Sequence, residues 1–129
     1  MSHTPHEVDY LVVGAGAMGM AFTDTLLHES DATIALVDRL DRPGGHWNHA
    51  YPFVRLHQPS AYYGVNSRPL GENRLDASGR NAGMMELAGA HELLAYFDSS
   101  PAAGSPGTHS AHTSATPPSV RRQPAKRSM

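Results

Sequence analysis

Residues 9–22 read DYLVVGAGAMGMAF, and this stretch decides the fold that the sequence predicts. Residues 8–13, VDYLVV, are mostly β-branched or aromatic, which is typical of a strand that is covered on both faces in a parallel sheet. The strand runs directly into a loop with three glycines. Beyond the loop, apolar residues recur at spacings of three and four, which predicts a helix. The predicted buried stripe of this helix consists of Met18, Ala21, Phe22, Thr25 and Leu26.

A second β-rich run, TIALVD, occupies residues 33–38. Strand, glycine turn, helix and strand within roughly 30 residues form a βαβ unit with parallel strands and a right-handed crossover. The sequence therefore predicts an α/β fold, a partial Rossmann-type domain with a parallel sheet.

The loop GAGAMG matches the pattern G-x-G-x-x-G at Gly14, Gly16 and Gly19. In a dinucleotide-binding loop the first glycine permits the tight turn after the strand. The second allows the backbone to approach a pyrophosphate, and the third allows the helix to pack closely on the strand. The helix N-terminus adds free N–H groups and the positive end of the helix dipole. The backbone around Ala15, Ala17 and Met18 is therefore predicted to hold phosphates.

Asp38 lies at the end of the second predicted strand, at the spacing expected for an acid that accepts hydrogen bonds from an adenosine ribose. Its charge would repel a 2′-phosphate, whereas the neighbouring Arg39 keeps such a ligand possible. The loop after Asp38, RLDRPGGHWNHAYPF, is a poor helix former because it contains Pro43, Gly44 and Gly45.

The segments VDYLVVGAGAMGMAF and VDRLDRPGGHW resemble the N-terminal end of FAD-dependent oxidoreductases with two dinucleotide-binding domains, and most of all the flavin-containing monooxygenase-like branch. The resemblance covers residues 8–98. It implies that the βαβ unit holds the ADP half of FAD, and that NAD(P)H reduces the flavin in a complete homologue.

By the same resemblance, the loop that contains Arg42, Gly45, His46 and Trp47 passes close to the cofactor. Paired glycines remove side chains where a loop must lie against a bulky ligand. Trp47 offers a flat apolar surface with one N–H donor, and Arg42 can face the pyrophosphate. The sequence identifies no catalytic residue.

Two other interpretations remain open. GAGAMG is also similar to the N-terminal loop of NAD(P)-dependent hydroxyacid dehydrogenases, in which a helix normally follows the second strand. The chain could also be a non-catalytic nucleotide-binding remnant. Family members of the FAD-dependent kind run to several hundred residues, and no third strand, second glycine fingerprint or late flavin-binding segment is visible after residue 98. We therefore expect a truncated member of the family.

The sequence of residues 81–129 predicts a last helix followed by a tail. Asn81 could cap a helix over residues 82–98. Its predicted apolar face consists of Met84, Leu87, Ala88, His91, Leu94, Ala95 and Phe97. From Ser99 onward the composition is mostly Ser, Ala, Pro, Thr and Gly, which buries too little apolar surface to offset the entropy of ordering. The predicted organisation is thus a domain over residues 1–98 and a disordered, basic tail over residues 99–129.

Composition limits the possible partners. The chain has no cysteine and a formal net charge of -2, and it contains no apolar run long enough to span a bilayer. We expect a cytoplasmic protein whose ligand is a small-molecule dinucleotide, with no nucleic-acid or membrane partner. His46, His49 and His57 lie in irregular sequence without a helical i, i+4 pair, so we expect no metal site.

Overall fold

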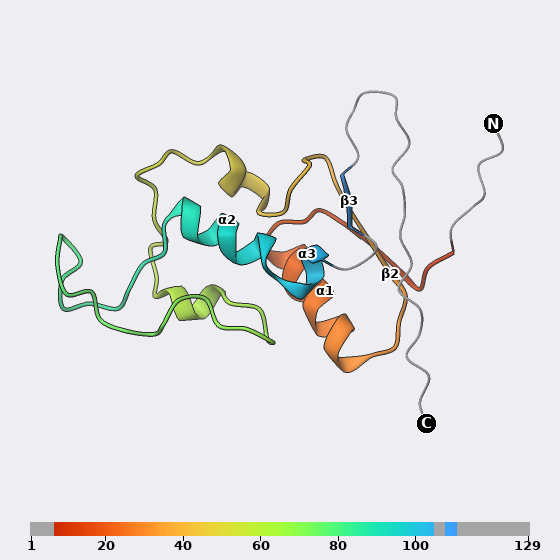
Figure 1. Cartoon of the computed structure of the whole chain (residues 1–129), viewed down its shortest axis with the longest axis horizontal. Coiled ribbons are helices and arrows are strands. Elements are labelled where there is room, and N and C mark those ends of the chain that lie inside the picture. Colours follow the sequence, from red (N-terminus) through yellow and green to blue (C-terminus); the bar gives the residue numbers. More distant parts are fainter. Residues whose placement is uncertain (1–6, 105–107, 111–129) are drawn as a thin grey trace.

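The computed structural model describes residues 7–104 and 108–110 of the chain. It confirms the predicted βαβ unit: strand β1 is Tyr10–Val13, helix α1 is Ala17–Glu29 and strand β2 is Ile34–Asp38. The two strands are parallel, and their register runs from the pair Tyr10–Ile34 to the pair Val13–Val37. Helix α1 packs beside the strands that it connects (Figure 1). The chain is therefore a partial Rossmann-type α/β domain.

A third strand extends the sheet. Strand β3, Thr108–Ser110, pairs in parallel with β2 and gives the order β1-β2-β3. It follows a short helix α3, Pro101–Gly104, in which Ala102 is fully buried in the core. The expectation that no third strand follows residue 98 is thus wrong. Residues 101–104 and 108–110 form these two elements, whereas the boundary at residue 98 and the disorder of the tail stay predictions. The rest of the predicted tail, 105–107 and 111–129, lies outside the described residues.

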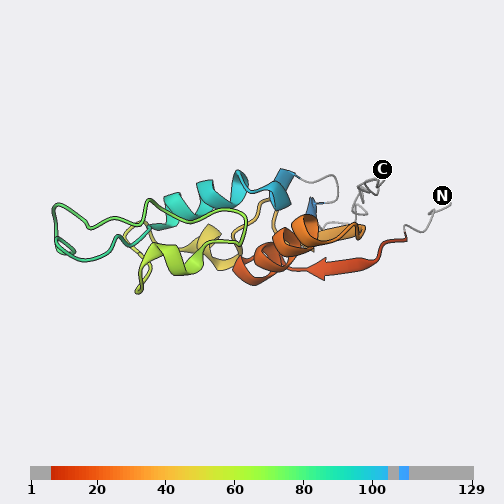
Figure 2. The ribbon, with the colours of Figure 1, turned by 90° about the horizontal axis from the view of Figure 1, so that it is seen from below.

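Residues 45–98 contain little regular structure. The 3-10 helices η1 and η2 are Gly45–His49 and Ser60–Tyr63, and helix α2 is Ala90–Asp98. Both views show α2 and the irregular loops extending the molecule away from the sheet (Figures 1 and 2).

The expected helix over residues 82–98 is wrong in its first half. Gly83 has φ +78°, and Gly89 is extended immediately before α2 begins. The N–H of Gly89 donates to the Glu92 side chain at 2.7 Å, which fixes the start of the helix. Asn81 does not cap a helix, because its amide donates to the Asp76 carboxylate and to the carbonyl of Met85.

Both helices bury a face that matches the predicted one only in part: Ala21 and Leu26 of α1 and Phe97 of α2 pack into the core as predicted. In α1 the buried residues are Met20, Thr23 and Asp24, whereas Met18 and Phe22 are exposed. The Asp24 carboxylate accepts hydrogen bonds from the backbone N–H and the hydroxyl of Ser67. These contacts join α1 to a loop 43 residues away, a partner that the helical period could not reveal.

In α2 the larger side chains that face the core are Leu93, Tyr96 and Phe97, and His91 and Ala95 are exposed. One core cluster joins these residues to the βαβ unit. Its buried members are Val12, Ala15, Met20, Ile34, Leu36, Leu56, Val65, Leu70, Ala88, Leu93, Tyr96, Phe97 and Ala102.

Candidate functional site

The glycine loop connects β1 to α1 with a turn that needs its glycines. Gly14 has φ +104°, a conformation that L side chains rarely adopt, and its N–H donates to the carbonyl of Val37 at 2.7 Å. A Cβ at Gly19 would overlap the carbonyl oxygen of Gly14, so the third glycine lets the helix lie against the end of the strand. These two positions have the structural roles that the sequence predicts for them.

At the N-terminus of α1, backbone N–H groups have no hydrogen-bond partner among the described residues. The first backbone bond of the helix runs from the N–H of Met20 to the carbonyl of Gly16, so the N–H groups of residues 16–19 precede the helical ladder. Within the described chain, no side chain caps this end, and no acidic residue lies in the first turn. Ala17 and Met18 are exposed, and the end of the helix is therefore open to an anionic ligand.

Asp38 faces this loop. Its carboxylate accepts a hydrogen bond from the N–H of Ala15 at 2.5 Å and another from the N–H of Leu40 at 2.7 Å. Each oxygen retains a further acceptor position, because an ionised carboxylate has about four lone-pair sites. The acid and the glycine loop thus lie together at the carboxyl end of strands β1 and β2, as the spacing in the sequence predicts. Arg39 is exposed beside them.

The loop with the paired glycines packs directly on the glycine loop. The N–H of Gly44 donates to the carbonyl of Ala15 at 2.8 Å. A Cβ at Gly45 would lie 3.1 Å from the Cα of Gly16, so the two loops approach without side chains between them. Gly44 and Gly45 have φ +115° and φ +54°, which favour glycine at both positions. The side-chain amide of Asn48 donates hydrogen bonds to the carbonyls of Pro43 and Gly45 and so stabilises the loop.

The remaining predicted residues lie further along this loop. Trp47 is half-buried and packs against the core, and its ring centroid is 5.2 Å from that of the exposed His46. Arg42 pairs with Asp98, with 3.1 Å between Arg42 Nη2 and the carboxylate. That contact ties the loop to the end of α2, and the expected contact between Arg42 and a pyrophosphate stays a prediction.

Helix α2 supports the loop in a way that the sequence did not reveal. A Cβ at Gly44 would lie 2.5 Å from Leu94 Cδ2, so the loop is held between α2 and the glycine loop. Leu94 is separated from Gly44 by about 50 residues of mostly irregular chain, and no local pattern connects the two positions.

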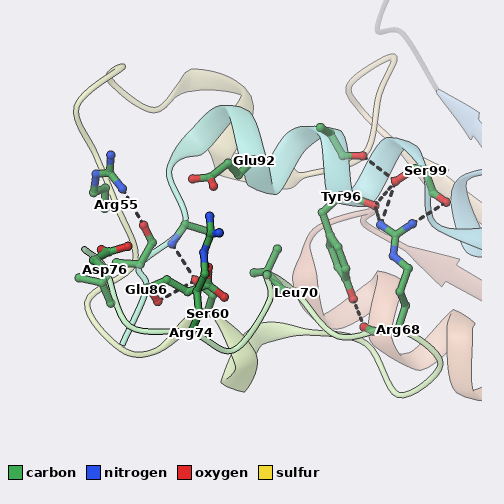
Figure 3. A pocket seen from close by; sticks show the side chains of 14 residues that line it. Arg55, Ser60, Arg68, Leu70, Arg74, Asp76, Glu86, Glu92, Tyr96 and Ser99 are labelled. Atoms are coloured by element: carbon green, nitrogen blue, oxygen red, sulfur yellow. Dashed lines mark hydrogen bonds and ion pairs between the residues drawn. The ribbon is translucent and has the colours of Figure 1, made fainter. Parts of the chain in front are cut away.

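A separate cavity of about 450 Å³ lies on the other side of α2 (Figure 3). Its arginines are already engaged: Arg68 donates to the carbonyls of Tyr96 and Ser99, and Arg55 donates to that of Leu87. Arg74 pairs with Glu72 and lies 3.7 Å from the Glu86 carboxylate. None of the predicted cofactor residues lines this cavity. The glycine loops are therefore the better candidate site.

The described residues offer no metal cluster and no membrane-spanning helix. Over residues 7–104 and 108–110, no group of three or more His, Asp or Glu side chains has an arrangement that could hold a metal ion. In the same part of the chain, no helix has the length and apolar character needed to cross a membrane.

Comparison with known proteins connects this geometry to a family. Residues 12–66 match the family described as an NAD(P)-binding Rossmann-like domain. The chain is 67% identical over 92 residues to the uncharacterized protein Rv2000 of Mycobacterium tuberculosis, a match that covers 71% of this chain and 17% of that protein. It is also 32% identical over 110 residues to a ferredoxin–NADP reductase of Salinispora tropica, a match that covers 85% of this chain and 34% of that enzyme.

Two solved structures are similar in fold. A mutant of a flavin monooxygenase from Stenotrophomonas maltophilia superposes with a TM-score of 0.53 at 26% identity, over 70% of this chain and 24% of that one. A flavin-containing monooxygenase of the same organism gives a TM-score of 0.52 at 24% identity, over 70% of this chain and 25% of that one. The match over residues 12–66 and these similarities confirm the predicted resemblance to FAD- and NAD(P)-binding oxidoreductases.

Proposed function

We propose that this chain supplies the part of a flavin-dependent, NAD(P)H-using oxidoreductase of the monooxygenase type that binds the ADP half of FAD. The observation that carries the proposal is the junction of two glycine loops and an acid. Asp38 accepts a hydrogen bond from Ala15, and Gly45 lies against Gly16. Among the described residues, this arrangement leaves the amides at the start of α1 without a partner, and Gly16 and Gly45 place no side chain between the two loops.

The residues fit the ADP moiety in charge and in shape. The pyrophosphate would lie at the N-terminus of α1, where unpaired N–H groups and the helix dipole favour negative charge. Asp38 would accept hydrogen bonds from the ribose hydroxyls through its remaining lone pairs. Arg42 would reach the pyrophosphate only by exchanging its contact with Asp98.

The chain beyond β2 favours FAD over NAD(P). It forms a five-residue 3-10 helix, η1, which ends in the irregular loop that leads to η2. An NAD(P)-dependent dehydrogenase would normally continue with an α-helix at this point. The chemistry that a bound FAD supplies is acceptance of electrons from NAD(P)H and their transfer to O₂ or an organic substrate. The chain spans about a sixth of its mycobacterial relative and a third of the reductase, so this activity belongs to the proposal for a complete protein.

Calorimetric titration of the full chain with FAD, ADP, NAD⁺ and NADP⁺ tests the proposal. FAD binding at least as tight as ADP binding, with weaker binding of both nicotinamide dinucleotides, supports it. Equal affinity for all four ligands supports a nucleotide-binding remnant, and a preference for NAD⁺ or NADP⁺ supports a dehydrogenase origin. Failure of FAD to bind at millimolar concentration contradicts the proposal.

A matched pair of variants locates the site. Asp38→Asn keeps the size of the side chain and removes the charge that faces the ribose, and we expect at least a fivefold loss of FAD affinity. Asp41→Asn makes the same change on an exposed acid three residues away and should leave the affinity unchanged. Truncation of a longer gene stays a prediction. Translation of the other reading frames downstream of the Ser99 codon tests it, because a second glycine fingerprint should appear there.

A further inference from the structure

Met18 places an oxidisable sulfur at the start of helix α1. Its side chain is 83% exposed, the largest exposure among the large apolar side chains of the described residues. Met20, two residues further along the same helix, is fully buried. The chain has no cysteine, so methionine sulfur is the side-chain group that a two-electron oxidant attacks most readily. Exposure therefore directs such an oxidant to Met18 rather than to Met20.

Oxidation would change the chemistry of this position. A thioether is apolar and a weak hydrogen-bond acceptor, whereas a sulfoxide is polar and carries an acceptor oxygen. Side chains of an α-helix lean toward its N-terminus, so that of Met18, the second residue of α1, leans toward the end of the helix. The N–H groups of residues 16–19 at that end have no partner among the described residues. A sulfoxide oxygen on Met18 can therefore accept a hydrogen bond from one of these amides.

We propose that Met18 is a site of reversible oxidation, and that its sulfoxide weakens the binding of an ADP moiety at the start of α1. The second half of the proposal rests on the function proposed above, because the pyrophosphate would use the same amides. A hydrogen bond between an amide and the sulfoxide must break before that amide can donate to a phosphate. The partial negative charge of the sulfoxide oxygen also repels the phosphate oxygens.

The oxidant is a peroxide, of which hydrogen peroxide is the simplest. The sulfur lone pair attacks one peroxide oxygen, so that an S–O bond forms and the O–O bond breaks. The sulfur loses two electrons, and the departing hydroxide takes the proton from the sulfur-bound oxygen and leaves as water. Uptake of two electrons and two protons by O₂ yields the same peroxide, so the electron transfer to O₂ proposed above supplies this oxidant. Oxidation of Met18 would then lower the cofactor occupancy of a protein that releases peroxide.

Met84 provides the matched comparison. Its side chain is 56% exposed, so peroxide should reach this sulfur as well. Met84 belongs to no helix, and its own N–H donates to the carbonyl of Asn81 at 3.0 Å. A sulfoxide at Met84 is therefore not placed at a helix N-terminus, and its formation should leave nucleotide binding unchanged.

Peroxide treatment of the full chain without nucleotide tests the first half of the proposal. Tandem mass spectrometry should show the sulfoxide forming about tenfold faster at Met18 than at the buried Met20. In the isotope-labelled variant Met84→Leu, oxidation should shift the amide NMR signals of residues 16–19. The methionine sulfoxide reductases for the two epimers should together reverse these shifts. Equal rates at Met18 and Met20, or equal shifts in oxidised Met18→Leu, overturn the proposal.

Calorimetric titration with FAD and ADP, before and after oxidation, tests the second half. Each variant is its own reference, so the readout is the ratio of two Kd values, and circular dichroism checks that the oxidised chain stays folded. In Met84→Leu, oxidation should raise the Kd of both ligands about fivefold, the scale of one hydrogen bond. In Met18→Leu the ratio should stay near one.

The same ratio in both variants, or a rise in Kd that the reductases do not reverse, overturns the proposed effect on binding. Failure of the unoxidised chain to bind either ligand contradicts the proposed function and, with it, the effect on binding. The mass spectra and the amide shifts still decide in that case whether Met18 is the oxidation site and whether its sulfoxide contacts the start of α1.

Discussion

The two ends of this molecule are held together in different ways. Around the glycine loops, residues 9–49, contacts between backbone atoms fix the structure. Helix α1 lies close to the end of β1, and the two loops lie close to each other, because positions such as Gly19 and Gly45 have no Cβ. Around α2, polar side chains fix irregular backbone over long sequence separations: Tyr96 with Val65, and Ser60 with Ala88. The backbone contacts at the glycine loops leave the start of α1 accessible to a ligand. The side-chain contacts around α2 instead hold irregular loops against the hydrophobic core.

The largest effect should come from Gly19→Ala. The new Cβ would overlap the Gly14 carbonyl, which is backbone and cannot move aside cheaply. We expect destabilisation of about 3 kcal/mol or more, at the upper end of overpacking costs. Chemical denaturation followed by circular dichroism measures it.

Gly16→Ala is the matched comparison for Gly19→Ala. Its Cβ would lie 3.8 Å from the Cα of Gly45, an ordinary contact. Stability should change by less than about 1 kcal/mol, the scale on which Gly and Ala differ in backbone preference. FAD affinity should fall, because the new methyl group narrows the approach to the amides. Equal destabilisation by the two variants would show that the glycines serve folding alone.

Tyr96→Phe should weaken the α2 end without affecting the ligand site. The buried Tyr96 hydroxyl accepts the N–H of Val65 at 2.7 Å and donates to the carbonyl of Arg68. Its removal leaves a buried N–H without a partner, which costs about 1–3 kcal/mol. Thermal denaturation should report this loss while the FAD affinity stays within twofold. A large loss of affinity would show that the two ends are coupled.

Arg42→Ala probes the link between the two ends. The Arg42–Asp98 pair is about half exposed on both sides. Exposed ion pairs contribute roughly 0–1 kcal/mol, so stability should hardly change. A fall in FAD affinity that exceeds the change in stability would show that Arg42 leaves Asp98 for the pyrophosphate. Unchanged affinity in calorimetry would leave Arg42 with a structural role only.

The smallest effect concerns pH at the start of β1. Hydrogen bonds from the backbone N–H and the hydroxyl of Thr33 lower the pKa of Asp9 below its ordinary value. A lowered folded-state pKa gives stability that is present above the unfolded pKa and is lost as the pH falls through the folded one. Asp9→Asn should therefore flatten the acid limb of the melting-temperature profile slightly. NMR titration of the Asp9 carboxyl checks the direction, and a raised pKa would refute it.

The sequence predicted the glycine-loop end better than the α2 end, for a physical reason. The turn at Gly14, the close approach at Gly19 and the acid at Asp38 are set by neighbours within one βαβ unit, so their spacing is visible in the sequence. The buried faces of α1 and α2 depend on partners such as Ser67 and Val65, which long loops bring into contact. Helical period alone cannot choose among faces when polar side chains such as Asp24 are buried.

The most direct test is to map the backbone amides of the isotope-labelled full chain by NMR during titration with ADP. We expect the largest, saturable shifts at residues 14–19, with smaller ones at Asp38 and residues 44–47, and no response from the amides that line the cavity beside α2. Shifts centred on Arg68, Arg74 and Tyr96, or no saturable shift at the start of α1, would contradict an ADP site at the glycine loops.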